Sequence, residues 1–372
     1  MTVTVVETAT EVVSGVNGVT GINGVNGVSV PATNGRNPRF SLPDTTPRSS
    51  KTSMVISGVR IYIYGLDDLP PPPAGSTVTD DVAVLFLAHN RTRTYRVTEG
   101  IAHELLHRYR SDGRAKRMNM IAVTMDMRNH GEREISPDAN RTWAGGNERH
   151  AIDLLSLIDG GVYDFQLVMD YLPMYLPQFA RLHNIMAGVS LGAHTAWRLA
   201  ALARPGQIQG YAMVVGCPNL TSLLVARLGV GPEDLKEGED DTRLDLVEDD
   251  ARWDEMLDDT QKRRFPRALA RLVRRQDRRI ADAFSTDTPI LLCNGAQDEL
   301  VPARYTAAWA KTRGVLPTDD VVRKPSTDGK DAQPPLIDLL IQDNTGHSCT
   351  KEMVARIAVW LGDLFASPTV SP

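Results

Sequence analysis

Three side chains that together can cleave an acyl bond occur along this chain in the order serine, aspartate, histidine. Ser190 lies inside the segment Gly188-Val-Ser-Leu-Gly192, and Asp298 and His347 follow much later in the chain. A serine hydroxyl attacks a carbonyl only when a histidine takes its proton and a carboxylate orients that histidine. The set therefore predicts Ser190 as nucleophile, His347 as base and Asp298 as the orienting acid, with Glu299 in reserve.

The residues around Ser190 predict a tight turn between a strand and a helix. A short apolar run over 184–187 precedes the turn, and apolar residues at helical spacing follow it, namely Thr195, Ala196, Leu199, Ala200 and Leu202. Gly188 and Gly192 leave room for the neighbouring backbone to approach the strained serine. The first amides of the following helix, beginning with that of Leu191, are placed to stabilise a developing anion.

Both triad partners follow predicted strands, at 289–294 and 336–341. Further apolar strands are predicted at 82–88, 120–125 and 210–216, with a strand or hairpin over 55–64. Helices are predicted over 98–112, 147–158, 164–176, 303–312 and 351–365. This alternation is typical of an α/β fold whose mostly parallel sheet is flanked by helices, with ligands at the carboxyl ends of the strands.

In the order and spacing of these motifs the chain resembles the α/β-hydrolase superfamily, over about residues 54–366. The resemblance rests on four motifs. They are the tight turn at Ser190, called the nucleophile elbow, the segment Gly295-x-x-Asp298-x-x-Val-Pro302, the pair Gly346-His347 and the segment Asp126-Met-Arg-Asn-His-Gly131. The resemblance implies the α/β-hydrolase fold and the roles of nucleophile, acid and base at the three triad positions.

The resemblance also implies an oxyanion hole with two backbone amides, one of them from Leu191. The second is expected in the loop after strand 82–88, where many members of the superfamily have His-Gly and this chain has His89-Asn90. We therefore assign it to the backbone of Asn90 or Arg91. His89 and His130 are candidates to line the pocket.

The domain organisation expected from the sequence is a tail and one large domain with an insertion. Residues 1–50 begin with a Gly/Val/Asn-rich repeat that predicts disorder, and the hydrolase-like domain covers 51–372. Within it, 218–287 interrupts the alternation with an acidic stretch followed by a basic one. Its apolar residues keep helical spacing, including Phe265, Ala268, Leu269, Leu272, Val273 and Ile280, which predicts a helical cap or lid with the arginines facing outward.

A rival motif, His103-Glu-Leu-Leu-His107, fits the pattern of zinc proteases. Histidines four apart share a helix face and can bind zinc, with the glutamate as base. However, both histidines fall outside the apolar arc of this helix, and no third ligand follows on a neighbouring helix. We expect a solvated helix face here, and neither a metal nor an organic cofactor.

The composition excludes several other classes of protein. The chain has 372 residues, 42% hydrophobic, and a net charge of −5, so it lacks the excess of positive charge typical of nucleic-acid partners. No apolar run reaches the roughly 18 to 20 residues of a membrane span, and the N-terminus lacks a secretory signal. Three scattered cysteines indicate a reducing, cytoplasmic setting.

The function expected from these residues is that of a serine hydrolase acting on a small-molecule acyl substrate. It would cleave a carboxylic ester or related acyl bond through an acyl-enzyme. An acyltransferase, amidase, lactonase, thioesterase or carbon–carbon hydrolase would share the same motifs, and a catalytically silent binding module is the alternative of another class. The sequence leaves the substrate and the oligomeric state open.

Overall fold

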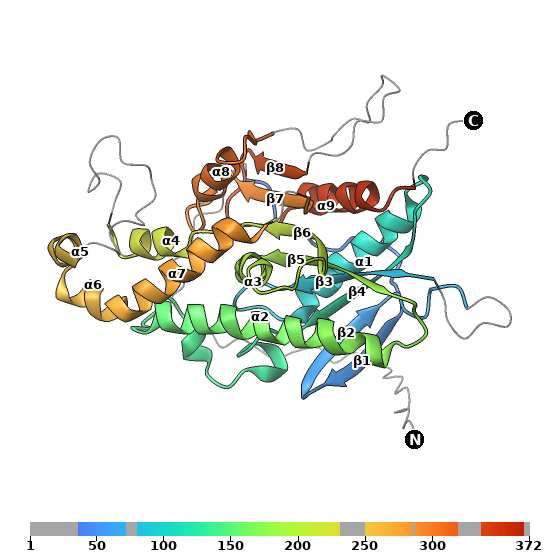
Figure 1. Ribbon diagram of the computed structural model, residues 1–372, viewed down its shortest axis with the longest axis horizontal. Coiled ribbons are helices and arrows are strands. Elements are labelled where there is room, and N and C mark those ends of the chain that lie inside the picture. The colour runs from blue at the N-terminus through green and yellow to red at the C-terminus, as the bar shows by residue number, and fades with distance from the viewer. Residues whose placement is uncertain (1–35, 72–79, 231–249, 285–286, 319–335, 368–372) are drawn as a thin grey trace, which may run out of the picture. The chain divides into compact units, whose positions relative to one another are not determined.

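The computed structural model describes residues 36–71, 80–230, 250–284, 287–318 and 336–367 (Figure 1). These residues form one sheet of eight strands in the order β1-β2-β4-β3-β5-β6-β7-β8. The strands are β1 (Lys51–Ile56), β2 (Val59–Tyr64), β3 (Val82–Ala88), β4 (Asn119–Met125), β5 (Leu182–Val189), β6 (Ile208–Val214), β7 (Ile290–Gly295) and β8 (Ile337–Gln342). From β4 to β8 all pairings are parallel, which confirms the predicted class of sheet.

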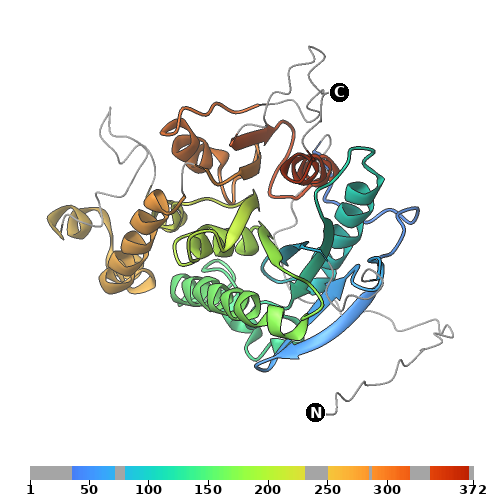
Figure 2. The ribbon, with the colours of Figure 1, turned by 45° about the vertical axis from the view of Figure 1, so that its right-hand side comes forward.

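The first two strands form an antiparallel hairpin at one edge of the sheet, opposite the edge formed by β8 (Figure 2). Its two turn residues, Ser57 and Gly58, have φ angles of 48° and 80°. A two-residue turn with positive φ at both positions matches the right-handed twist of the strands it joins. The predicted strand or hairpin over 55–64 is therefore a hairpin, and β2 joins it antiparallel to β4.

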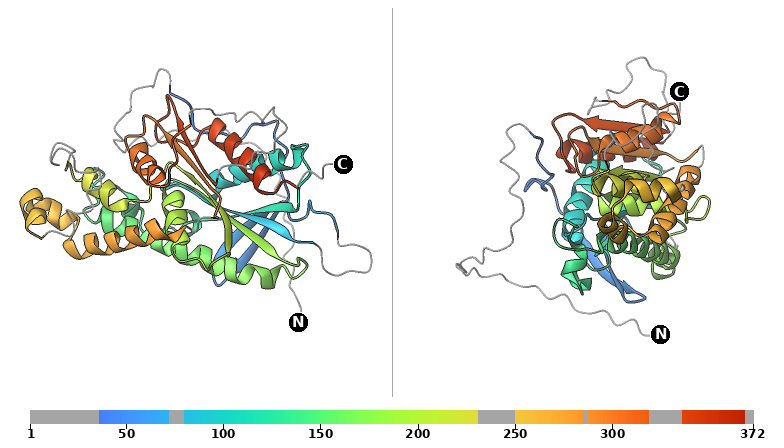
Figure 3. Two further views of the ribbon diagram at one scale, coloured as in Figure 1. Left: turned by 45° about the horizontal axis from the view of Figure 1, so that its top comes forward. Right: turned by 90° about the vertical axis from the view of Figure 1, so that its left-hand side faces the viewer.

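Helices cover both faces of the sheet (Figure 3). Helices α1 (Tyr95–Ser111) and α9 (Lys351–Leu364) lie on one face; α2 (His150–Tyr175), α3 (Leu191–Ala200), α7 (Arg267–Ala283) and α8 (Ala303–Lys311) lie on the other. Along β3, Val84 and Phe86 pack into the second layer, whereas Leu85 and Leu87 pack into the first. Burial on both faces explains why β3 is apolar throughout.

Helix α2 is continuous where the sequence predicts two helices. Gly160 and Gly161 lie in its middle, and β-carbons there would come within 2.5 Å of the Arg128 side chain and 2.6 Å of that of Met127. The two glycines thus let the loop after β4 lie directly against the helix. Their low helix propensity, which suggested a break, is outweighed by this packing.

Residues 36–50, here called the N-terminal strap, are packed against the domain instead of belonging to the tail. The Asn37 amide donates to the Asn344 carbonyl at 2.7 Å, and the Phe40 amide donates to the Cys349 carbonyl at 2.7 Å. Thr46 is buried against α1. The expected tail boundary near residue 50 is therefore too late in the chain, and the predicted disorder of 1–35 concerns residues outside those described.

The insertion contributes helices α4 (Leu220–Arg227), α5 (Asp250–Met256), α6 (Asp259–Arg264) and α7, which lie to the left of the sheet in Figure 1. Two short 3-10 helices, η1 (Gly131–Arg133) and η2 (Pro137–Asn140), precede α2. The buried residues of α7 are Ala270, Val273, Asp277 and Ile280. Ala268 and Leu272 are exposed instead, so the buried stripe is rotated from the one predicted. Within the described residues no helix is long and apolar enough to cross a membrane.

Candidate active site

Ser190 lies on a sharp turn between β5 and α3. It has φ 54° and ψ −109°, a conformation rare for residues other than glycine. A β-carbon on Gly188 would lie 2.2 Å from the Gly192 carbonyl oxygen, and one on Gly192 would lie 2.1 Å from the Ala88 carbonyl oxygen. The two glycines are therefore required for the strand, the turn and the end of β3 to approach one another.

The three side chains of the predicted triad meet at the carboxyl ends of the strands. His347 Nε2 lies 2.8 Å from Ser190 Oγ, and His347 Nδ1 lies 2.8 Å from Asp298 Oδ2. Because the carboxylate only accepts, Nδ1 carries the proton and Nε2 is free to accept that of the serine hydroxyl. The Asp298 side chain is fully buried, and that of His347 is 21% exposed.

Asp298 is fixed by its own loop, which follows β7. Its Oδ1 accepts hydrogen bonds from the backbone amides of Leu300 at 2.9 Å and Val301 at 2.8 Å. A β-carbon on Gly295 would lie 2.3 Å from the Thr345 carbonyl oxygen, so the loop that carries His347 passes close to the end of β7. Neighbouring Glu299, the reserve acid, is exposed and has no hydrogen bond to His347 within the described residues.

The loop after β3 is held by His89. Because a backbone amide only donates, the Met127 amide at 2.9 Å makes His89 Nε2 an acceptor, and Nδ1 then donates to the Asn90 carbonyl at 2.8 Å. His89 is fully buried, and burial lowers the pKa of its ring to about 4. Asn90 has no positive φ angle, so the glycine found here in many α/β-hydrolases is not needed.

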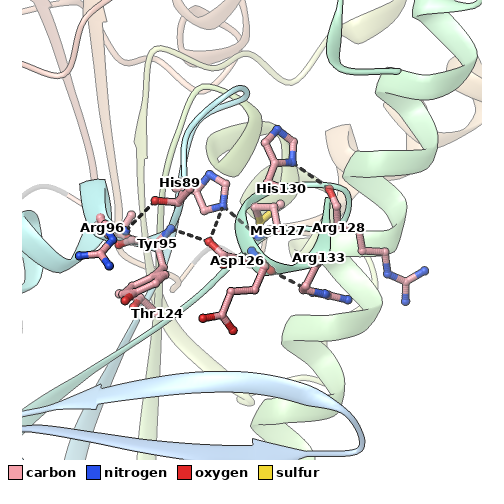
Figure 4. Close-up of polar contacts among 12 residues, drawn as sticks. His89, Tyr95, Arg96, Thr124, Asp126, Met127, Arg128, His130 and Arg133 are labelled. Atoms are coloured by element: carbon pink, nitrogen blue, oxygen red, sulfur yellow. Dashed lines mark hydrogen bonds and ion pairs between the residues drawn. The ribbon is translucent and has the colours of Figure 1, made fainter. Parts of the chain in front are cut away.

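Asp126, at the end of β4, ties the loop after β4 to the start of α1 (Figure 4). Its carboxylate accepts from the backbone amides of Tyr95 at 2.8 Å and Glu132 at 3.0 Å. Gly131 has φ 55°, and a β-carbon there would lie 2.2 Å from Asp126 Oδ2. The Asp-x-x-x-x-Gly spacing of this loop thus reflects a turn folded tightly around its own carboxylate.

His130 stands beside His89 with its ring 5.3 Å away and edge-on. Its Nδ1 donates to the Arg128 carbonyl at 2.8 Å, and the residue is 1% exposed. Burial lowers the pKa of its ring. The sequence predicts that His89 and His130 line a pocket, and this prediction is wrong. Both are buried, so they support the loops after β3 and β4 from within.

Two cationic side chains were not predicted from the sequence, those of Arg227, which lies beside Asp298, and Arg91. Arg227 ends α4, donates to the Leu300 carbonyl at 2.9 Å and lines a hollow of about 920 Å³ together with Asp298. Arg91 Nη1 lies 3.3 Å from Nδ1 of His150, a buried residue at the start of α2. No motif marks His150 or Arg227, because only the folded chain brings the start of α2 to Arg91 and the end of α4 to Asp298.

The His103–His107 motif is placed differently from the expectation. His103 is buried and its Nδ1 accepts from the Ser49 amide at 3.1 Å, while Glu104 Oε2 accepts from the Thr46 hydroxyl at 2.6 Å. The expected solvated face is wrong for His103, because the N-terminal strap covers it. Among the described residues no three His, Cys, Asp or Glu side chains are grouped as metal ligands.

Comparison with known proteins finds no matching family model and no matching curated protein. Among solved structures, TT1662 from Thermus thermophilus is 17% identical, with a TM-score of 0.49 over 87% of this chain and 100% of its own. A cold-adapted esterase from an Arctic intertidal metagenomic library is 14% identical, with a TM-score of 0.42 over 88% and 100%. Est1E from Butyrivibrio proteoclasticus is also 14% identical, with a TM-score of 0.41 over 84% and 96%.

The order of the strands is itself diagnostic. A hairpin at one edge leads into parallel strands, the crossover between β3 and β4 precedes β5, and the strained serine follows β5 directly. With this topology and this elbow, the chain has the fold of the α/β-hydrolase superfamily.

Proposed function

We propose that the protein is a serine hydrolase that cleaves a carboxylic ester, or a related acyl bond, of a small molecule. One observation carries the proposal. An unbroken line of hydrogen bonds runs from the buried carboxylate of Asp298 through the ring of His347 to the hydroxyl of Ser190, which stands on a strained elbow. This is the arrangement that makes a serine hydroxyl nucleophilic at neutral pH.

In the proposed reaction, Ser190 Oγ attacks the carbonyl carbon while its proton moves to His347 Nε2. The tetrahedral intermediate collapses, the bond to the leaving alcohol breaks, and His347 returns the proton to that alcohol. His347 then takes a proton from water as the water attacks the acyl-enzyme, and the acid departs as Ser190 is regenerated. Asp298 stays ionised and stabilises the imidazolium in both halves.

The oxyanion would be bound by two backbone amides. Leu191 is the first residue of α3, and the first amides of a helix have no acceptor within it. For the second amide we favour Arg91 over Asn90. The Asn90 carbonyl points to His89, and in a trans peptide the following amide points the opposite way, away from the buried ring.

The test is labelling with a fluorophosphonate probe, together with the hydrolysis of short 4-nitrophenyl esters. We expect the wild-type protein to be labelled at Ser190 and Ser190→Ala to remain unlabelled. His347→Ala should lose about three or more decades of turnover while it stays folded. Labelling that persists in Ser190→Ala would place the nucleophile elsewhere, and a protein that is neither labelled nor active would be a binding module.

A further inference from the structure

Within the described residues, Arg91 in the loop after β3 and Arg227 at the end of α4 have no carboxylate partner. Arg91 follows Asn90, whose carbonyl accepts from His89, and within the described residues the Arg91 guanidinium contacts His150. Arg227 extends from the end of α4 to the Leu300 carbonyl, two residues beyond Asp298. In the parts of the chain that the structure describes, neither guanidinium forms an ion pair. Most other arginines near α2 do form one, such as Arg264 with Glu148 at 2.8 Å.

The surroundings make these two charges costly. Nε of Arg227 is buried and has no hydrogen-bond partner within the described residues. Burial and the positive charge of Arg91 lower the pKa of Arg227 to about 10, and burial lowers that of Arg91. Both guanidiniums still remain protonated at neutral pH. Both arginines are half-buried, so each guanidinium loses part of its hydration without gaining a counter-charge, which suggests that a ligand supplies the counter-charge.

The neighbouring groups do not supply it. The carboxylate of Asp298 already accepts from His347 and two backbone amides. His150 is neutral, because burial and the charges of Arg91 and Arg227 lower the pKa of its ring to about 3. The hollow beside Asp298 is also lined by Arg36 and Arg304 and by the exposed carboxylate of Glu299, so three cations face two carboxylates on its wall.

We propose that the substrate carries an anionic oxygen group, a carboxylate or a phosphate, and that Arg91 and Arg227 bind this group beside the ester. The inference rests on the proposed hydrolase function, since it names the substrate class of the same site. A guanidinium presents its N–H groups in a planar fork that fits the paired oxygens of a carboxylate or phosphate. Arg91 and Arg227 are then specificity-determining residues.

The test compares two esters with the same leaving group, 4-nitrophenyl glutarate monoester, which is anionic, and 4-nitrophenyl valerate, which is neutral. We expect the wild-type protein to prefer the anionic ester in kcat/KM by about tenfold or more. Arg227→Gln and Arg91→Gln should each lower the ratio of the two kcat/KM values about tenfold, and Arg227→Lys should restore part of it. Arg181→Gln is the matched control, because this exposed arginine precedes β5 at the end opposite Ser190.

The binding of a free anion tests the same inference without requiring turnover. Calorimetry on Ser190→Ala with glutarate and with inorganic phosphate should detect binding of one of them. That anion identifies the group, and its binding should weaken in the double variant with Arg227→Gln but not in that with Arg181→Gln. Equal kcat/KM ratios in the wild type and Arg227→Gln, or no binding of either anion, would overturn the inference. Loss of probe labelling would instead count against the proposed hydrolase.

Discussion

Ser190 is held in a backbone conformation that a side chain normally avoids. Its φ of 54° with ψ of −109° places the hydroxyl at the tip of the turn, where His347 reaches it. Strain of this kind costs about 1–3 kcal/mol and is retained only where the surrounding structure enforces it. The elbow is thus a place where stability and the proposed activity oppose each other.

This opposition gives a prediction at the level of one residue. Ser190→Ala and Ser190→Gly both remove the proposed nucleophile and should both be inactive, but only glycine adopts this conformation freely. We expect Ser190→Gly to be more stable than Ser190→Ala by about 1 kcal/mol, measured as the free energy of unfolding in urea. Equal stability of the two variants would mean that the turn is not strained in solution.

At the scale of elements, a buried carboxylate joins the elbow helix to the insertion. Asp277 on α7 lies 3.2 Å from the guanidinium of Arg198 on α3, and its other oxygen accepts from the amide and hydroxyl of Thr221, at 2.8 and 2.6 Å. Both members of the ion pair are nearly inaccessible. Three helices therefore depend on one side chain, and one of them, α3, follows Ser190 directly.

Removing that carboxylate should weaken the whole arrangement. We expect Asp277→Ala to lower the free energy of unfolding by about 3 kcal/mol, because it leaves the buried guanidinium of Arg198 with only the more distant and partly exposed Asp159, at 3.7 Å, as a counter-charge. Asp277→Asn keeps an acceptor for Thr221 and should cost less. Urea denaturation checks both, with Asp282→Ala, near the end of α7, as the control. A loss no larger than that of the control would show that the pair contributes little.

The pattern of apolar residues in the sequence was enough to predict the strands that are buried on both faces. Apolar strands such as β3 and the glycine-flanked serine have local signals, and their positions follow from the sequence within a few residues. The burial of Asp277 was not predicted, because a charged residue on a helix rich in arginine is expected to face solvent. The single helix α2 was missed because Gly160 and Gly161 look like a break until the loop packed on them is known. Contacts between segments that are far apart in the chain cannot be predicted from a single sequence.

At the scale of the whole molecule, three buried neutral histidines should set its behaviour in acid. Burial lowers the pKa of His89 to about 4, and of His150 and His194 to about 3, from an ordinary value of 6.5. Below pH 6.5 the unfolded chain binds protons that the folded protein does not, so stability falls as the pH falls. The loss continues until the pH approaches the folded values, between about 4 and 3.

The slope of unfolding free energy against pH measures this effect. Each of the three histidines should add about one proton taken up on unfolding between pH 6 and 4. His194 donates through Nδ1 to the Cys217 carbonyl at 3.1 Å, a bond that an amide can also make. His194→Gln should therefore fold and show a slope shallower by one proton. An unchanged slope would mean that His194 titrates normally in the folded state.

The N-terminal strap has a practical consequence. Asn37 Nδ2 donates to the Asp343 carbonyl and the Thr345 hydroxyl, both at 2.9 Å, in the loop that presents His347. Further along, its Ser49 amide is bound by His103. A protein shortened to begin at β1 would lose the contacts that hold the loop of the proposed general base, His347, and would uncover His103 on α1. The turnover measured with such a shortened protein would be low even though the proposed catalytic side chains are all present.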